Sequence, residues 1–322
     1  MWGSLSSVEY LMLKRLDNPE QYLTESKFKE GVAKLKEVLR KDVHKILVDN
    51  GLINLPIRIE KIDKIGMAKI RIEYADMNEN EQGLLIPDER GFIIKVNRML
   101  KRLKARTIIA HELSHTFFYD IKELPPRKYG TFPSLPGTKT YWIEEDVCRF
   151  LAREFLMPTF SMKGLRQLFD VSIENLISLR RAFEVTYNIL LFRLIKDMEL
   201  WESAAIIYNR KNNLFMKELA IKGKGYKRVI IPSHIIIPSD TSSHPTFYAR
   251  QKEARRKSNE LLRNVIANSL IKATPDKTIK ENIRISGRPH VIEVRKLSPK
   301  GERFLVLIHP REYAKSPLEI SL

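Results

Sequence analysis

The sequence has almost no cysteine and no long apolar run. Cys148 is its single cysteine, which excludes an intramolecular disulfide and with it the disulfide frameworks of small secreted domains. No apolar run reaches the ~20 residues that a membrane-spanning helix needs. Charged residues such as Glu9 and Lys14 interrupt the one apolar stretch near the N-terminus, so no secretory signal is expected. These absences make the cytoplasm the expected compartment.

Acidic residues are too few to balance the basic ones. The 322 residues include 57 Lys and Arg but only 39 Asp and Glu, a formal net charge of +18. A hydrophobic fraction of 43% is typical of a globular protein, and the length favours two compact units. The charge predicts either a polyanionic partner such as nucleic acid or basic side chains spread over solvated faces. The second interpretation is favoured because many basic residues alternate with acidic ones.

Hydrophobic spacing predicts a helix and then a small sheet in the first hundred residues. Apolar residues recur every three or four positions over residues 26–50, and Gly51 follows as a helix-ending glycine. Residues 68–74 alternate as a β-strand does. Residues 83–86 and 92–97 flank a Pro/Asp/Gly turn, which predicts a β-hairpin.

The central part of the chain is predicted to be helical. One helix is expected from about Lys101 to Tyr119, and helices resume near Trp142 and continue, with breaks, to about Met198. Between them, residues 125–137 are rich in Pro and Gly and predict a loop that frames a cleft.

Beyond residue 198 the pattern changes to short strands around one basic helix. Residues 204–208 and 214–216 predict a hairpin, and residues 290–294 and 303–308 predict two further strands. A basic helix is expected over about residues 246–270. The sequence thus predicts an α+β protein with an N-terminal helical region at 1–50, a mainly helical domain with a small sheet at 51–198, and a basic α+β domain at 199–322.

The most specific motif is His-Glu-Leu-Ser-His at residues 111–115, within the helix expected from 101 to 119. Histidines four residues apart lie on one helical face, so His111 and His115 can reach one metal ion. Glu112 lies beside them, where a general base would take a proton from the attacking water. The motif predicts a zinc site of the kind found in metallopeptidases, with manganese as an alternative ion.

A catalytic zinc needs a third protein ligand, and three adjacent acids in a later helix offer one. Glu145 is the preferred ligand, because the small residues Cys148 and Ala152 lie three and seven positions later and allow close approach of the two helices. Glu144 or Asp146 could ligate instead, or stabilise the N-terminus of that helix. Cys148 is expected to be a small packing residue rather than a thiolate ligand.

Other residues are weaker candidates for the same site. Tyr129 and Tyr141 could donate a hydrogen bond to the oxyanion of a tetrahedral intermediate, although packing is the commoner role of such aromatics. Asp120, five residues after His115, could orient a ligand histidine or could be an ordinary residue at the helix end.

The C-terminal part carries most of the excess charge. From Asp197 to Leu322 there are 24 Lys and Arg against 13 Asp and Glu. Contact with DNA phosphates and a solvated helix face are both compatible with this pattern, and the solvated face is favoured. The candidates for DNA contact are Arg250, Lys252, Arg255, Arg256 and Lys257.

Taken together, the motifs resemble the ImmA/IrrE family of metallopeptidases. The resemblance covers about residues 30–195 and rests on several segments rather than on the histidine motif alone. It comprises a Pro-x-x-Ile-Glu element at 56–60, a Gly-to-Asn strand at 91–97, the Arg-to-His helix at 106–115, the Glu-to-Met-Pro helix at 145–158 and a Val-Ser-to-Arg element at 171–181. The departures from the family pattern are Ser114 for Gly, Tyr119 for His, Cys148 for Ala and Arg149 for Asn.

The resemblance implies a zincin-like fold and a cytoplasmic zinc protease that cleaves a helix-turn-helix repressor, inducing a stress response or mobile-element genes. It also implies a sensory or regulatory C-terminal domain similar to GAF domains in some members. The alternative is a non-enzymatic DNA- or partner-binding regulator, as in toxin–antitoxin pairs, with a vestigial or structural metal site. A structural zinc has four protein ligands, whereas a catalytic zinc has three and an open position, so the number of ligands separates the two.

Overall fold

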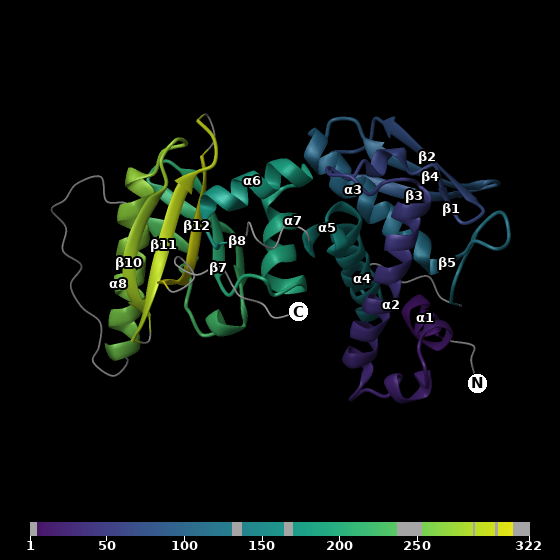
Figure 1. Ribbon diagram of the computed structural model, residues 1–322, viewed down its shortest axis with the longest axis horizontal. Helices are drawn as coiled ribbons and strands as arrows, with labels where there is room; N and C mark the ends of the chain where they lie inside the picture. The colour runs from purple at the N-terminus through teal and green to yellow at the C-terminus, as the bar shows by residue number, and fades with distance from the viewer. Residues whose placement is uncertain are drawn as a thin grey trace. The chain divides into compact units, whose positions relative to one another are not determined.

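The structure is a computed structural model that describes residues 5–130, 137–163, 170–236, 253–285, 287–299 and 302–311 (Figure 1). Helices and antiparallel strands both occur, and the expected α+β class is confirmed. The chain divides into two compact units, and each unit combines two segments that are not contiguous in the sequence. The first unit contains residues 1–164 and 181–189, and the second contains residues 165–180 and 190–322. The domain boundaries expected near residues 50 and 198 stay predictions.

The first unit is built from helices around a small sheet. Its helices are α1 (Ser7–Arg15), α2 (Phe28–Asp49), α3 (Arg102–His115), α4 (Lys139–Leu156) and α5 (Thr159–Lys163), with short 3-10 turns at Pro19–Tyr22, Ile59–Lys61 and Thr116–Phe118. Helix α2 ends as the sequence predicts: Gly51 has φ +67°, and the N–H of Leu52 donates to the carbonyl of Leu47. The apolar stripe of α2, including Leu39 and Val43, is buried.

The sheet of the first unit has four strands in the order β1 (Lys64–Ile65), β2 (Ala68–Ala75), β4 (Gly91–Asn97) and β3 (Gly83–Asp88). The expected hairpin is confirmed, since β3 and β4 pair antiparallel with Gly83 opposite Val96. Strand β2 pairs parallel with β4. Strand β3 therefore forms one edge of this sheet in the described chain, and both β3 and β4 pack on α3.

Helix α3 is buried between this sheet and α4. Ala105, Ile109 and Leu113 recur every four residues and are at most 4% exposed, which places one face of α3 in the core. Leu151 and Phe155 are also buried and place one face of α4 in the core. Helix α4 packs on both α3 and α2. The burial of both helices fixes their rotation about their axes, and with it the direction of their polar side chains.

The helix expected from Lys101 to Tyr119 is shorter in the structure, and that boundary was wrong. Helix α3 ends at His115, residues 116–118 form a 3-10 turn, and Tyr119–Asp120 form strand β5, which pairs with β6 (Arg127–Lys128). The hydroxyl of Thr116 donates to the carbonyl of Leu113, which satisfies an acceptor at the end of the helix. The hairpin β5–β6 thus begins one 3-10 turn after the second histidine of the motif.

The second unit contains a six-stranded antiparallel sheet with one long helix. The strands follow the order β10 (Ile279–Ile285), β11 (Arg288–Lys296), β12 (Arg303–Pro310), β7 (Ala204–Lys211), β8 (Leu214–Lys222) and β9 (His234–Ile236). The predicted hairpin 204–216 and the two later strands are confirmed. Strand β10 was not predicted, because three consecutive polar residues at 280–282 interrupt its apolar pattern. The expected GAF-like character of this part of the chain stays a prediction.

Helix α8 (Glu253–Lys272) covers one face of this sheet (Figure 1). Leu262, Ile266 and Leu270 form its buried stripe and pack against sheet residues such as Val306 and Ile308. Residues 246–252 of the expected basic helix lie outside the described residues, and the helix continues two residues past the expected end at Leu270.

In the sequence, helices α6 (Ile173–Phe183) and α7 (Tyr187–Phe192) lie between α5 and β7. A π-helical turn at Arg193–Asp197 follows α7. A buried carboxylate from the sheet holds the start of α6. Glu293 on β11 is 2% exposed; its Oε2 accepts the Ile173 N–H at 2.7 Å, and its Oε1 lies 2.8 Å from the Lys280 ammonium. His309 is buried beside it.

Burial alone would raise the pKa of Glu293, but the neighbouring His309 and the contacts with Lys280 and the Ile173 N–H outweigh burial and lower the pKa. The ionised carboxylate therefore stabilises the fold above its unfolded-state pKa of about 4.3. That stabilisation is lost as the pH falls through the lower, folded-state value.

Substitution of this buried carboxylate tests its contribution. Glu293→Gln is expected to lower the free energy of unfolding by about 2 kcal/mol at neutral pH. The deficit should shrink as the pH falls below about 4.3, where the carboxylate becomes protonated in the unfolded chain and the ionised group stabilises the fold less. Urea unfolding at neutral pH and at an acidic pH below that value measures this, with Glu174→Gln, whose side chain is 49% exposed, as the control. An equal deficit at both pH values would contradict the ionised role.

No helix in the described part of the chain is long and apolar enough to cross a membrane.

Candidate metal centre

Helix α3 presents the two histidines of the motif side by side. Their rings are 4.8 Å apart between centroids and nearly perpendicular, at 89°. The Nε2 atoms of His111 and His115 are 3.2 Å apart. Both side chains are 18% exposed, so solvent reaches the rings although the helix behind them is buried. The spacing of four residues thus places two nitrogen lone pairs at one point.

Helix α4 supplies a carboxylate at the same point. Glu145 Oε2 lies 3.4 Å from Nε2 of His111, and its Oε1 lies 3.4 Å from Nε2 of His115. In the part of the chain that the structure describes, these three side chains form the one group of His, Cys, Asp and Glu residues able to hold a metal ion. One ligand atom from each lies within 4.8 Å of the others.

The separations fit a tetrahedral zinc ion. With metal–nitrogen distances of about 2.0–2.1 Å, two ligand atoms of a tetrahedral site lie about 3.3 Å apart. The two Nε2 atoms are 3.2 Å apart, and each lies 3.4 Å from a different oxygen of Glu145, so the carboxylate spans the space between the two nitrogens. Two neutral imidazoles and one carboxylate are also a donor set that zinc accepts, and they leave a coordination position without a protein ligand.

The outer nitrogen of His115 is held by a second carboxylate. Nδ1 of His115 lies 3.4 Å from Oε1 of Glu144, and that oxygen also accepts a 2.8 Å hydrogen bond from Lys128 on β6. A carboxylate on the remote nitrogen fixes the tautomer and keeps Nε2 free to ligate. Sequence reasoning left Glu144 as a ligand or a helix-terminal charge. The structure places it behind His115, whereas Glu145, the ligand that the sequence analysis preferred from the small residues Cys148 and Ala152, faces the Nε2 atoms.

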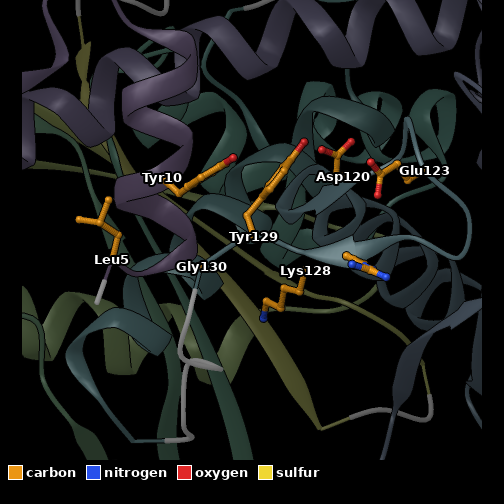
Figure 2. A pocket seen from close by; sticks show the side chains of 8 residues that line it. Leu5, Tyr10, Asp120, Glu123, Lys128, Tyr129 and Gly130 are labelled. Atoms are coloured by element: carbon orange, nitrogen blue, oxygen red, sulfur yellow. The ribbon is translucent and has the colours of Figure 1, made fainter. Parts of the chain in front are cut away.

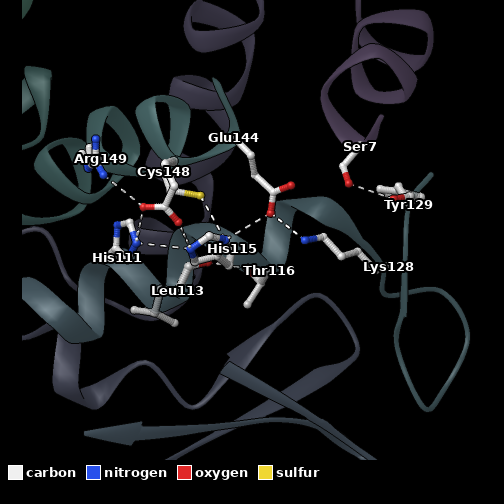
Figure 3. A network of polar contacts seen from close by, with 11 residues as sticks. Ser7, His111, Leu113, His115, Thr116, Lys128, Tyr129, Glu144, Cys148 and Arg149 are labelled. Atoms are coloured by element: carbon white, nitrogen blue, oxygen red, sulfur yellow. Dashed lines mark hydrogen bonds and ion pairs between the residues drawn. The ribbon is translucent and has the colours of Figure 1, made fainter. Parts of the chain in front are cut away.

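Cys148 packs against the same nitrogen from the other side. Its buried Sγ lies 3.3 Å from Nδ1 of His115, so it does not face the Nε2 atoms (Figure 3). Burial raises the pKa of the Cys148 thiol, which disfavours a thiolate. Its small side chain lets α4 approach α3 closely, which is the packing role that the sequence predicts.

Charge within the cluster is arranged around the two histidines. Burial acts to raise the pKa of Glu145, but hydrogen bonds with His111 and His115 outweigh it and hold the pKa well below the usual carboxyl value. Glu145 is therefore ionised, as a metal ligand must be. Burial also acts to lower the pKa of His115, whereas its contacts with Cys148, Glu144 and Glu145 raise it well above 6.5.

Glu112 lies beside the cluster, under the edge strand β3. It is 8% exposed, and burial is the main reason that its pKa is raised above the usual carboxyl value. The nearby backbone N–H of Leu85 acts in the opposite direction and lowers this pKa in part. A Cβ atom at Gly83 would lie 2.2 Å from Ile108 and 3.2 Å from Oε1 of Glu112. Strand β3 can approach Glu112 this closely because residue 83 is glycine, a requirement that the sequence analysis missed.

The two tyrosines proposed as oxyanion donors lie in separate surroundings. Tyr129 follows β6 and stacks on Tyr10 with ring centroids 4.9 Å apart, beside a cavity of about 300 Å³ that Asp120 also lines (Figure 2). Tyr141 stands on the first turn of α4, in edge contact with Trp142. No contact between either phenol and the histidines is found among the described residues, so both roles stay predictions.

Asp120 and Tyr119 lie in strand β5, beyond the end of α3. Asp120 accepts a hydrogen bond from the N–H of Lys122, and Glu144 occupies the position behind His115 that Asp120 was considered for. Tyr119 is half-buried, and burial raises the pKa of its phenol, on which the charges of His115 and Glu112 also act. Tyr119 is thus a neighbour of the centre, although sequence reasoning treated it only as a departure from the family motif.

The residues proposed for DNA contact are described only in part. Arg250 and Lys252 lie outside the described residues. Arg255, Arg256 and Lys257 lie on the first turns of α8, but their side chains are outside the described part of the structure. DNA contact by these residues stays a prediction.

Comparison with known proteins places a family domain over this centre. Residues 67–195 match the model of a peptidase family described as the IrrE N-terminal-like domain. No curated protein matches the chain. A solved structure described as a Mycobacterium tuberculosis transcriptional regulator is similar, with 12% identity and a TM-score of 0.47 over 88% of this chain and 92% of that chain. A likeness of that size carries no conclusion about function.

The matched range contains α3 and α4, and therefore every residue of the His111, His115 and Glu145 cluster. It also contains β3, the strand that covers Glu112. The family resemblance expected from the sequence motifs is confirmed: residues 67–195 of this chain form a domain of the IrrE N-terminal-like peptidase family.

Proposed function

We propose that this chain is a zinc-dependent endopeptidase whose metal is held by His111, His115 and Glu145. The observation that carries the proposal is the convergence of two Nε2 atoms and one carboxylate at separations of 3.2 to 3.4 Å. Three protein ligands, rather than four, favour a catalytic over a structural zinc. A bound zinc ion supplies Lewis acidity, which lowers the pKa of water to about 7 and polarises a carbonyl group.

Glu112 is the proposed general base. Its carboxylate takes a proton from the attacking water and delivers it to the leaving amine as the peptide bond breaks. Burial and the raised pKa of Glu112 suit this task, because a base whose pKa lies nearer to neutrality both accepts and returns a proton readily.

Strand β3 is the proposed binding edge for the peptide. It is one of the two edge strands of its sheet in the described chain, and Gly83 brings its backbone against Glu112. An extended peptide can add to such an edge through main-chain hydrogen bonds. A substrate paired with β3 would therefore have its backbone next to the general base, which favours a peptide over a small-molecule substrate.

The identity of the substrate is proposed from family resemblance alone. A helix-turn-helix repressor is the expected protein substrate, and its cleavage would induce a stress response or mobile-element genes. The competing function is a DNA- or partner-binding regulator with a vestigial or structural metal site. Cys148, the one further soft ligand near the cluster, faces Nδ1 of His115 rather than the Nε2 atoms, which supports the peptidase.

Metal-dependent hydrolysis tests the proposal directly. Protein loaded with one equivalent of zinc is expected to cleave an unstructured protein substrate such as casein, or a helix-turn-helix repressor encoded beside it. Metal-free protein prepared with a chelator should be inactive and should recover activity on addition of zinc. Binding of zinc by four protein ligands, measured by X-ray absorption, together with no cleavage of either substrate, would favour the regulator.

A further inference from the structure

Helix α4 carries two large exposed side chains on the face that holds Glu145. Trp142 and Arg149 lie three residues before and four residues after Glu145, which places all three on one helical face. Trp142 is 53% exposed and the Arg149 side chain is 50% exposed, whereas Glu145 is 11% exposed. On this face of α4, the largely buried Glu145 thus lies within one turn of an exposed side chain on either side.

The guanidinium group of Arg149 connects the two parts of this face. Its Nη2 lies 3.4 Å from Oε2 of Glu145, the oxygen that faces Nε2 of His111 (Figure 3). Its central carbon lies 6.0 Å from the centroid of the Trp142 ring. The guanidinium group of Arg149 therefore contacts the carboxylate of a proposed metal ligand, Glu145, and it also lies close to the indole ring of Trp142.

Both side chains of this pair are about half exposed. An exposed tryptophan leaves a large apolar area in water, and large exposed aromatics beside arginine are typical of binding surfaces. A guanidinium group has five N–H donors, and in the described part of the chain Arg149 uses one nitrogen on Glu145. The remaining donors are free to bind a planar anion such as a carboxylate.

We propose that Trp142 and Arg149 form a substrate-selecting surface, which binds an acidic side chain of the peptide together with an adjacent apolar side chain. This inference rests on the proposed peptidase function and names a feature of its substrates. The carboxylate pairs with Arg149 and the apolar group packs on the indole of Trp142. Because Arg149 contacts a proposed metal ligand, the acidic residue lies near the scissile bond.

Binding of labelled peptides tests the surface without relying on turnover. The protein is the zinc-loaded Glu112→Gln variant, which holds the three metal ligands unchanged. The probes are alanine-based decapeptides carrying fluorescein and a central Phe-Glu, Phe-Gln or Phe-Lys pair, followed by fluorescence anisotropy. The glutamate peptide is expected to bind about tenfold more tightly than the lysine peptide, as one charge-assisted hydrogen bond would give.

Substitutions on α4 assign the preference to the two side chains. Arg149→Gln should make the three peptides bind with similar affinity. Arg149→Glu should reverse the order of affinities, so that the lysine peptide binds most tightly. Trp142→Ala should weaken binding of all three by a similar factor. Arg90→Glu, at an exposed turn, makes the same change in net charge as Arg149→Glu and should leave the order of peptide affinities unchanged. The zinc content of each variant is measured, because Arg149 touches Glu145.

An unchanged order in the zinc-loaded Arg149→Gln variant would overturn the inference, as would equal binding of the three peptides or no binding of any. Hydrolysis by the wild-type chain is measured separately. Charge-ordered binding without hydrolysis would refute the peptidase function and leave the surface in place. Hydrolysis without any charge order would refute the surface and leave the peptidase in place.

Discussion

Glu112→Gln is expected to reduce peptide hydrolysis by about three orders of magnitude while leaving zinc binding intact. The amide keeps the size of the side chain, so the packing of α3 under β3 is retained. It cannot accept a proton from water, so the step assigned to Glu112 is lost. The reaction rate and the zinc content are measured on the same preparation. The prediction requires the rate to fall while the zinc content stays at the wild-type level.

The control for this substitution is Glu89→Gln, which makes the same chemical change at an exposed position in the β3–β4 turn. It should leave both activity and zinc content unchanged. A second check is the pH dependence of the rate. Because burial raises the pKa of Glu112, wild-type activity should fall as the pH decreases through that raised value, where the base becomes protonated. Full activity in the Gln variant would remove Glu112 from the mechanism.

Glu145→Ala is expected to weaken zinc binding by roughly a hundredfold or more, since even losses of groups behind the ligands cost about 10- to 100-fold. The substitution removes the negative charge and one of the three atoms that converge at the centre. The two histidines alone form an incomplete site. Titration with zinc against a chromophoric chelator measures the affinity directly and does not depend on any substrate.

The neighbouring acid supplies a matched control for Glu145. Asp146 is the next residue on α4, but its side chain is 60% exposed and pairs with Lys36. Asp146→Asn should therefore leave zinc affinity unchanged. Equal losses in the two variants would indicate a general electrostatic effect of acids on α4 rather than ligation. Unchanged affinity in Glu145→Ala would remove the carboxylate from the proposed site.

Local sequence patterns were sufficient to predict the parts of the fold that local physics controls. Helix α2 and its glycine end, the β3–β4 hairpin and the helix that carries His111 and His115 all follow from periodicity and turn chemistry. The error at the end of α3 has the same origin. Thr116, Phe117 and Phe118 continue an apolar helical pattern, and only the pairing of β5 with β6 shows that the α-helix stops at His115.

The sequence by itself determined that two histidines share a helical face and that an acid-rich helix follows, because spacing of four residues has one geometric meaning in an α-helix. Only the tertiary structure decided how the adjacent acids Glu144 and Glu145 divide their contacts. Consecutive residues on a helix point about 100° apart, so the packing of α4 on α3 selects which carboxylate faces the Nε2 atoms and which lies behind His115. The closeness of Gly83 to Glu112 was likewise decided by packing, since it joins segments that periodicity treats as independent.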